Sequence, residues 1–333
     1  MTIKKISVYG AGSWGTALAL QLARNNIDVL LWDINPSQVK NINAARENTR
    51  YLPDIPFPDN LNCSPHLSDV LQHADYQLIV VPSHGFRQLL AKIKTHIKAH
   101  HVLIWATKGL EVDSGKLLHQ VLQEELPKLK KYGVISGPTF AGEVAKGLPT
   151  AMTAAATQQQ VAEQIGKAFT ADNFRVYTST DILGVELGGA IKNILAIAAG
   201  ISDGLGFGSN ARTALITRGL AEMMRLGNAM GANAETLMGL AGVGDLILTC
   251  TDDQSRNRRL GLALGQGKDF DAAIAEIGQA VEGAKSSQAI GLLAAKVGID
   301  MPICQHVHKI LYQNLSAHDA VHSLINRKIK AEF

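Results

Sequence analysis

Three glycines near the N-terminus, Gly10, Gly12 and Gly15, most constrain what this chain can fold into. They follow a short apolar segment, residues 4–9, and lead directly into a helical pattern over residues 16–24. A dinucleotide site needs this order: one glycine makes a tight turn after a strand, a second lets the backbone approach a pyrophosphate, and a third allows close helix–strand packing. The free N–H groups of the helix then face the phosphates. A tight strand-to-helix connection without a ligand is the alternative.

A second apolar segment, residues 28–33, ends in an acid. Asp33 lies about 20 residues after the glycines, the distance at which a carboxylate can bind ribose hydroxyls. Together with the glycine turn, this acid predicts a Rossmann-like fold that binds a dinucleotide.

Length and composition limit the class of protein. A chain of 333 residues suggests about two domains. A net charge of +3, with no basic run interleaved with aromatics, gives no reason to expect nucleic acid as a partner. The three cysteines are far apart, which suits a reducing cytosol and predicts no metal site. No signal-peptide pattern is present and no apolar run approaches the ~20 residues of a membrane span, so we expect a cytoplasmic protein without membrane insertion.

Strand-like and helix-like segments alternate to about residue 178. Their apolar runs are continuous, which indicates strands covered on both faces and hence a parallel sheet with crossover helices. The expected strands are 4–9, 28–33, 76–83, 101–108, 133–136, 150–155 and 174–178. Beyond them only helices are expected, at 181–202, 211–230, 234–240, 256–264, 284–297 and 303–314. The sequence therefore predicts a doubly wound α/β dinucleotide-binding domain, residues 1–180, followed by an all-α substrate domain, residues 181–333.

Ligands of open parallel sheets bind beyond the carboxyl ends of the strands, so the residues at those ends are candidates. Lys108 follows an apolar strand and either caps the sheet in solvent or faces an anionic ligand. Gly137 and Thr139 belong to a turn at the end of a later strand.

The long helix expected at 181–202 carries Lys192 beside an apolar stripe. Gly188 and Gly189 stand one turn earlier, and a glycine inside a helix costs about 1 kcal/mol relative to alanine. Because helical side chains point toward the N-terminus, the lysine projects over this turn, where missing side chains leave room for a ligand. Close helix packing beside an exposed lysine is the alternative.

A glycine-flanked acid, Asp245, precedes Ser255, Arg256 and Asn257 at the start of an expected helix. A hydroxyl, a guanidinium, an amide and free helix N–H groups suit a phosphate monoester, although a solvated surface loop would look similar. We expect Arg256 to carry the function and the arginines at 258 and 259 to be solvent-facing or structural.

Five motifs in this order closely resemble those of the bacterial NAD(P)-dependent glycerol-3-phosphate dehydrogenases. They are residues 10–17 (GAGSWGTA), 108–110 (KGL), 136–141 (SGPTFA), 186–193 (ELGGAIKN), and 242–245 (GVGD) with 255–259 (SRNRR). The resemblance implies reversible hydride transfer between NAD(H) or NADP(H) and the pair sn-glycerol 3-phosphate and dihydroxyacetone phosphate, without a metal. It also implies a supply of glycerol 3-phosphate for glycerophospholipid synthesis, and a homodimer formed through the helical half.

Matching positions assign residues to each ligand. In addition to the motif residues Gly10, Gly12, Gly15 and Asp33, the cofactor would contact Ser13, Trp14, Lys108, Ala141, Arg256 and Glu282. The substrate would contact Lys108, Gly137, Thr139, Lys192, Asp245, Ser255, Arg256 and Asn257. Lys192 corresponds to the family's proton acceptor, and Lys108 and Asp245 are its expected catalytic partners. Burial and two cations, Lys108 and Arg256, would lower the pKa of this lysine, and Asp245 would raise it.

The chain departs from the family just beyond the second strand. Members often carry a histidine or arginine there to meet a 2′-phosphate, where this chain has Asp33, Ile34 and Asn35. Asp33 favours an unphosphorylated ribose, so strict NADPH preference is not expected unless Arg46 or Arg50 swings in.

Two other functions would share much of this plan. A β-hydroxyacid or ketopantoate-type reductase would use a similar lysine, but it should bind a carboxylate and would not need the turn at 255–257. A nucleotide-sensing scaffold without turnover would need neither Lys192 nor Asp245.

Overall fold

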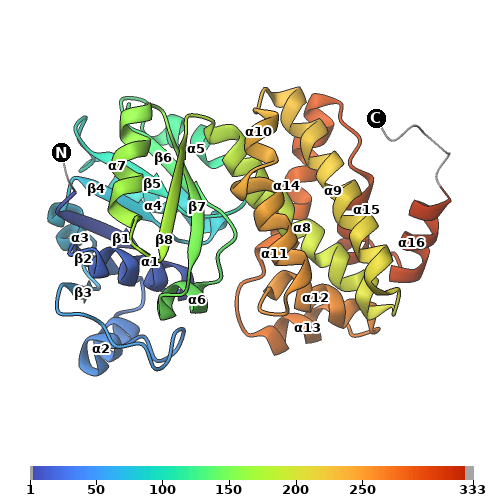
Figure 1. The fold of residues 1–333 in the computed structure, drawn as a ribbon, viewed down its shortest axis with the longest axis horizontal. Coiled ribbons are helices and arrows are strands. Elements are labelled where there is room, and N and C mark those ends of the chain that lie inside the picture. The colour runs from blue at the N-terminus through green and yellow to red at the C-terminus, as the bar shows by residue number, and fades with distance from the viewer. Residues whose placement is uncertain (1–2, 327–333) are drawn as a thin grey trace.

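The computed structural model describes residues 3–326. Residues 1–2 and 327–333, which the predicted domains include, lie outside the described residues. A sheet with flanking helices forms the N-terminal half, and the helical half lies beside it (Figure 1). The predicted fold class, an α/β Rossmann-like half followed by an all-α half, is confirmed.

One eight-stranded sheet organises the N-terminal half, in the order β3-β2-β1-β4-β5-β6-β7-β8. Its strands are β1 (Lys5–Tyr9), β2 (Asp28–Trp32), β3 (Leu61–Ser64), β4 (Tyr76–Ile79), β5 (Val102–Trp105), β6 (Tyr132–Ser136), β7 (Thr150–Ala156) and β8 (Phe174–Ser179). The strand order reverses between β1 and β4, the place where open α/β sheets bind their ligands.

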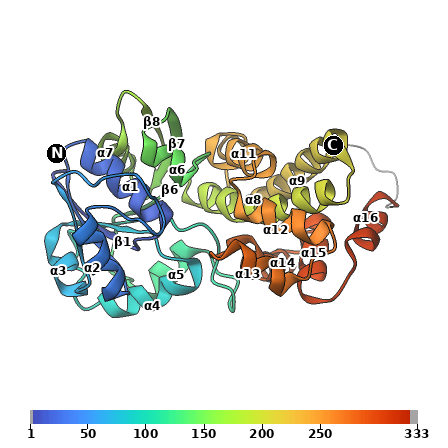
Figure 2. The same cartoon turned by 90° about the horizontal axis from the view of Figure 1, so that it is seen from below.

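Helices cover both faces of the sheet. They are α1 (Ser13–Arg24), α2 (Pro36–Ala45), α3 (Leu67–His73), α4 (Ser83–Ile93), α5 (Leu118–Glu125), α6 (Ala141–Lys146) and α7 (Gln159–Phe169). Figure 2 shows α1 and α7 on one side of the strands, and α4 and α5 on the other. Leu18 and Phe169 belong to the first apolar core, and Phe86 and Trp105 to the second. The strands are therefore buried on both faces, as their continuous apolar runs predict.

The prediction of a purely parallel sheet is wrong at one pair, because β6 and β7 are antiparallel. The segment between them contains only the six-residue α6. Six helical residues span about 9 Å, too short to return along the sheet as a parallel crossover would.

The 23-residue helix α8 (Ile182–Gly204) lies at the centre of the helical half. The elements that follow it are α9 (Gly208–Met230), α10 (Ala234–Leu237), the π-helical turn η1 (Leu240–Gly244), α11 (Asp245–Thr251), α12 (Arg256–Gly265), α13 (Phe270–Ile277), α14 (Glu282–Val297), α15 (Pro302–Tyr312) and α16 (Ala317–Ile325). Helix α8 is long and apolar enough to cross a membrane, but 94% of its most apolar window is buried inside the fold. The second stretch with these properties, Ala234–Thr251, is divided among α10, η1 and α11.

The sequence misses several short elements. They are β3, α5, α6, η1, α11, α13 and α16. The strands predicted at 76–83 and 101–108 are also too long, because β4 ends at Ile79 and β5 at Trp105. The residues that follow leave the sheet as loops, and these loops carry candidate site residues.

Glycines let α12 cross α8 at close range. A Cβ on Gly200 of α8 would lie 2.1 Å from the carbonyl oxygen of Arg258, and one on Gly261 of α12 would lie 2.0 Å from that of Ile197. Gly204 and Gly265 meet in the same way one turn later. Small residues at this crossing therefore let the backbones of α8 and α12 pack directly against each other.

Replacing Gly261 by alanine is expected to destabilise the helical half by about 1–3 kcal/mol, because the two backbones must separate. Gly291→Ala is the matched control, since nothing lies within 4 Å of a Cβ added at this α14 position. Alanine there should leave stability unchanged or raise it by up to about 1 kcal/mol. Urea unfolding followed by circular dichroism measures both variants, and wild-type stability of Gly261→Ala would contradict the close crossing.

Candidate active site

The three N-terminal glycines occupy positions with distinct requirements. Gly10 has φ +111°, and a Cβ there would lie 2.8 Å from the carbonyl oxygen of Val80. A Cβ on Gly15 would lie 1.9 Å from the carbonyl oxygen of Gly10. Nothing lies within 4 Å of a Cβ on Gly12, so its backbone is open to approach at the start of α1. A tight turn, close packing and an approachable backbone together fit a dinucleotide pyrophosphate.

The start of α1 leaves hydrogen-bond donors free. Gly12 stands at the N-cap and provides no side-chain acceptor, so the first N–H groups of the helix, beginning at Ser13, are open to a ligand. The Nε1 atom of Trp14 is buried and has no hydrogen-bond partner among the described residues. Buried donors normally have a hydrogen-bond acceptor, so the unpaired Trp14 donor also fits an acceptor supplied by a ligand.

The Asp33 carboxylate is held at the end of β2, beside the glycine turn. It accepts hydrogen bonds from the N–H groups of Ala11, at 3.1 Å, and Asn35, at 2.9 Å. The next side chain, Ile34, is 71% exposed and brings no positive charge. A carboxylate with no adjacent positive side chain therefore stands beside the glycine turn.

Both arginines that could reach this position are engaged elsewhere. Arg46 donates to the carbonyl oxygen of Pro58 at 2.6 Å and to Oδ1 of Asn62 at 3.1 Å. The guanidinium of Arg50 lies 5.2 Å from the centre of the Tyr51 ring. Neither arginine offsets the charge of Asp33 in this arrangement.

One buried carboxylate bridges the two halves of the molecule. Oδ2 of Asp245, on α11, accepts from Nζ of Lys108 at 2.6 Å, and Oδ1 accepts from Nζ of Lys192 at 2.9 Å. Lys108 follows β5, and Lys192 lies on α8. The side chain of Lys108 is 14% exposed and that of Lys192 9%, which rules out both a solvent cap on the sheet and an exposed lysine on α8. The anion that Lys108 faces is the chain's own carboxylate.

Burial sets the ionisation of this group. Burial lowers the pKa of Lys192 to about 8, the charge of Lys108 acts in the same direction, and Asp245 opposes them. Burial and Lys108 thus lower the pKa as predicted, whereas Arg256 is not among its main causes. Burial alone would raise the pKa of Asp245, but Lys108 and Lys192 together hold it below its ordinary value.

Thr249 supplies a second partner for Lys192, and no motif in the sequence indicates this contact. Nζ of Lys192 donates to Oγ1 of Thr249 at 2.8 Å, one helical turn after Asp245. An ammonium group has three donors, so Asp245 and Thr249 leave one position of Lys192 for another group.

The predicted space for a ligand over Gly188 and Gly189 is filled by protein. A Cβ on Gly188 would lie 2.3 Å from the carbonyl oxygen of Ala241, so close packing accounts for this glycine. A Cβ on Gly189 would lie 3.1 Å from Oγ of Ser136 and 3.7 Å from Cγ of Lys108. The second glycine therefore lets the α/β half approach α8.

The turn after β6 joins the lysine centre. Nζ of Lys108 donates to the carbonyl oxygen of Gly137 at 3.2 Å, and Oγ1 of Thr139 donates to the same oxygen at 3.2 Å. The buried hydroxyl of Ser136 has no hydrogen-bond partner within residues 3–326. The motifs did not single out Ser136 as a site residue, although Ser136 is the first residue of the 136–141 motif. Ala141, a predicted cofactor contact, is the first residue of α6.

The start of α12 differs in part from the prediction. The Ser255 hydroxyl oxygen caps the helix by accepting from the N–H of Arg258 at 3.2 Å. Both side-chain amide atoms of Asn257 are engaged, Nδ2 with Oδ1 of Asn193 and Oδ1 with the N–H of Gly283, each at 2.9 Å. These bonds tie α12 to α8 and α14.

The three arginines near this turn have different environments. Among the described residues Arg256 has no ion-pair partner, and its guanidinium donates only to Gln279, at 3.3 Å. Arg258 is buried and pairs with Asp203 and Asp253, and Arg259 is exposed. The predicted structural or solvent roles of the last two are confirmed.

Glu282, at the start of α14, makes a second contact between the halves. Its carboxylate accepts from Oγ of Ser83, the first residue of α4, at 2.9 Å. Burial raises the pKa of Glu282, while Ser83 and the nearby Lys285 and Arg256 oppose that shift. Apart from Lys192, which lies inside α8, the predicted site residues therefore lie on loops and helix starts from both halves. Their predicted ligand contacts stay predictions.

Comparison with known proteins gives consistent matches over most of the chain. The families described as NAD-dependent glycerol-3-phosphate dehydrogenase N-terminus and C-terminus match residues 5–162 and 181–322. A glycerol-3-phosphate dehydrogenase (NAD(P)+) of Thioalkalivibrio sulfidiphilus is 57% identical over 333 residues, 100% of both chains. One from Haemophilus influenzae is 51% identical over 328 residues, 98% of both.

Solved structures agree with these matches. A crystal structure of glycerol-3-phosphate dehydrogenase from Coxiella burnetii has a TM-score of 0.94 and 48% identity, and the alignment covers 98% of this chain and 99% of that one. A ketopantoate reductase from Ralstonia eutropha has a TM-score of 0.60 and 18% identity over 96% of this chain and 100% of that one. The second match shows a shared fold alone.

We expect the protein to bind NADH at least about tenfold more tightly than NADPH, because the Asp33 carboxylate would face the additional phosphate. Fluorescence titration of each reduced cofactor measures the ratio directly. Asp33→Ser combined with Ile34→Arg should narrow or reverse it, whereas Asp59→Ser, at an exposed acid of the same half, should not. Equal affinity of the wild type for both cofactors would contradict the role given to Asp33.

Proposed function

The chain belongs to the NAD(P)-dependent glycerol-3-phosphate dehydrogenase family, and we propose that the Lys108–Asp245–Lys192 centre is where its reaction takes place. The protein is an oxidoreductase that interconverts sn-glycerol 3-phosphate and dihydroxyacetone phosphate with NAD(H) or NADP(H). The observation that carries the proposal is that both lysines share one buried carboxylate, although they come from different halves.

The glycine turn is the proposed cofactor site. Gly12, Ser13 and the start of α1 would bind the pyrophosphate, Asp33 the ribose, and Trp14 a further acceptor through its unpaired Nε1. The cofactor, when bound, supplies or accepts the hydride, and the protein binds and orients it.

Lys192 is the proposed proton acceptor and donor. Oxidation of an alcohol carbon requires its hydroxyl proton to leave, and a base must lie within hydrogen-bond reach. The third position on Nζ, which Asp245 and Thr249 leave open, is available to the substrate oxygen. The lowered pKa of Lys192 allows it to take up this proton near neutral pH and return it during reduction. Lys108 would stabilise negative charge that develops on the same oxygen.

The start of α12 is the proposed phosphate site. Arg256 forms no ion pair among residues 3–326, and the positive end of this ten-residue helix favours an anion. Because both amide atoms of the Asn257 side chain are engaged, we assign its substrate contact to the backbone N–H. Gly137 and Thr139 would contact the substrate from the α/β half.

The domain division follows the same roles. We propose that residues 1–180 bind the dinucleotide and residues 181–333 select the substrate. The last strand ends at Ser179 and α8 begins at Ile182, which supports a boundary between them.

We further propose a cytoplasmic enzyme that supplies glycerol 3-phosphate for glycerophospholipid synthesis. All three cysteines, Cys63, Cys250 and Cys304, are free and buried, which suits a reducing compartment.

A homodimer formed through the helical half is also proposed. A hollow of about 1190 Å³ lies on this half, and its lining includes the apolar side chains of Leu215, Ile310 and Leu324. A second copy that covers the hollow would remove this apolar surface from water.

Light scattering should give twice the mass of one chain, and a monomer would contradict the proposal.

The protein should oxidise NADH when dihydroxyacetone phosphate is present and show no measurable rate with dihydroxyacetone. Arg256→Ala should raise KM for the phosphorylated ketone by about 100-fold, because a charge-assisted hydrogen bond to phosphate contributes up to about 3 kcal/mol. Arg259→Ala, an exposed arginine of the same helix, is the matched control and should change KM little. Equal rates with the unphosphorylated ketone would overturn the phosphate assignment.

Lys192→Met should lower kcat by at least about 100-fold, because positioned proton transfer typically contributes 100- to 10,000-fold. NADH affinity, measured by fluorescence, should stay within a few fold, since the glycine turn is unchanged. Lys40→Met replaces an exposed lysine on α2 and should retain full turnover. Near-normal turnover of Lys192→Met would remove this residue from the mechanism.

A further inference from the structure

Positive charge gathers in two stretches of the α/β half. Residues 92–101 and 125–131 contain six lysines and one glutamate, a net charge of +5. The whole chain carries +3, so the remaining residues sum to −2. We call these six residues the lysine patch: Lys92, Lys94, Lys98, Lys128, Lys130 and Lys131, all exposed. The small net charge of the chain therefore conceals a strongly basic region.

The lysine patch lies at the edge of the sheet opposite the candidate active site. Residues 94–101 connect α4 to β5, and residues 126–131 connect α5 to β6. Because β5 and β6 are parallel, these loops share the edge where both strands begin. One hollow of about 390 Å³ is lined by residues of both loops, among them Lys98 and Lys128. Lys108 and Gly137, in contrast, follow the ends of the same two strands.

Most of this charge is not neutralised. Among residues 3–326, Lys94 alone of the six lysines forms an ion pair, with Glu125 at 3.5 Å. Glu125 also pairs with Arg87 at 2.9 Å, and neighbouring Glu124 pairs with Arg87 and Lys116. The nearby acids are therefore already engaged.

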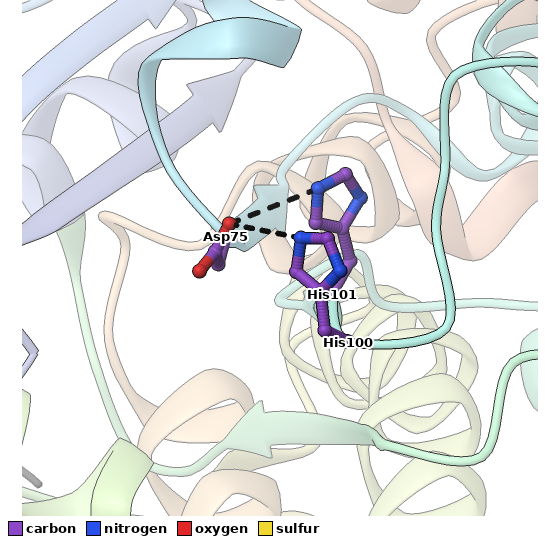
Figure 3. A group of neighbouring side chains, drawn as sticks. All are labelled: Asp75, His100 and His101. Atoms are coloured by element: carbon purple, nitrogen blue, oxygen red, sulfur yellow. Dashed lines mark ion pairs between the residues drawn. The ribbon is translucent and has the colours of Figure 1, made fainter.

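The carboxylate of Asp75, at the same edge of the sheet, lies close to two histidine rings. Its Oδ1 lies 3.3 Å from Nε2 of His100 and 3.9 Å from Nε2 of His101 (Figure 3). These three side chains could form a metal site by distance. However, the N–H of Lys98 donates to Nδ1 of His101 at 3.2 Å, which places the proton of the neutral ring on Nε2. That nitrogen then has no lone pair for a metal, so the group is better explained as local pairing of Asp75.

Helix capping does not account for the lysine patch. Lysines in the last turn of a helix interact favourably with its dipole, which covers Lys92 and Lys94 at the end of α4. This effect falls off within one turn. Lys98, Lys130 and Lys131 lie beyond α4 and α5, so their position has no such explanation.

We propose that the lysine patch docks the protein on a membrane surface rich in anionic phospholipids. Clusters of four to eight basic residues bind such surfaces. The two stretches contain no phenylalanine, tyrosine or tryptophan on which bases of a single strand could stack. They also contain no arginine, which binds phosphates in a bidentate manner. Ile97 and Leu129 line the hollow beside the lysines, and lysine stems can lie on apolar surface while their ammonium groups reach phosphates.

This mode of binding is peripheral, without insertion into the membrane. Docking by the edge where β5 and β6 begin turns the opposite edge, with Lys108 and Gly137, away from the lipid. Substrate and cofactor would then keep free access, and the inference does not depend on the proposed function.

Sedimentation of the full chain with vesicles tests the proposal. The wild type should bind vesicles that contain phosphatidylglycerol, not vesicles of phosphatidylcholine alone, and rising salt should weaken binding. Each lysine near an anionic surface gives roughly a fivefold gain in affinity. The affinity for anionic vesicles should therefore fall about 100-fold or more in the triple variant Lys98→Glu, Lys128→Glu and Lys131→Glu. Its turnover and thermal unfolding should match those of the wild type.

The matched control reverses the same number of exposed lysines elsewhere, as Lys40→Glu, Lys167→Glu and Lys309→Glu combined. The affinity of this control for anionic vesicles should stay within about threefold of that of the wild type, because local rather than total charge drives docking. Failure of the wild type to bind anionic vesicles at low salt, or an equal loss in both triple variants, would overturn the proposal. Tighter binding of single-stranded RNA than of vesicles through these lysines would assign the patch to nucleic acid and overturn it as well.

Discussion

The Asp245 carboxylate, buried between two ammonium groups, is the interaction on which the site depends. It accepts hydrogen bonds from Lys108 of the α/β half at 2.6 Å and from Lys192 of the helical half at 2.9 Å. Two positive charges against one negative charge leave a net positive charge in a buried position. An anionic substrate, or an oxygen that gains negative charge during reaction, would balance it. Removal of one partner from a buried ion pair typically costs about 3–5 kcal/mol, because an unpaired charge is left buried.

The surrounding backbone makes this pairing possible. Gly189 lets the side chain of Lys108 approach α8, and Gly188 lets η1 pack directly on the same helix. One end of α8 thus meets the α/β half. Further along, α12 crosses α8 at Gly200 and Gly261, and Arg256 is the first residue of α12. The lysine proposed for proton transfer and the arginine proposed for phosphate binding are therefore both positioned by contacts with a single core helix.

Signals that are local in sequence could be predicted, and those that need a distant partner could not. The glycine turn could be predicted from the spacing of its glycines, and the alternation of strands and helices from the apolar patterns. The antiparallel β6–β7 pair could not, because it depends on how short α6 is. Lys108, Lys192 and Asp245 could each be selected from motifs. Their shared hydrogen bonds join residues up to 137 positions apart and have no local signature. Thr249 was missed for the same reason, and Asn257 was assigned to substrate although its side chain ties three helices together.

Titration of the Lys192 ammonium by NMR, in lysine-labelled protein with the signal assigned through Lys192→Met, tests the central claim most directly. Burial between Lys108 and Asp245 predicts a pKa near 8 in the wild type, well below the ordinary lysine value of 10.5. Asp245→Asn removes the charge that raises this pKa and should lower it further. A wild-type pKa near the ordinary value, or one that Asp245→Asn leaves unchanged, would contradict the account.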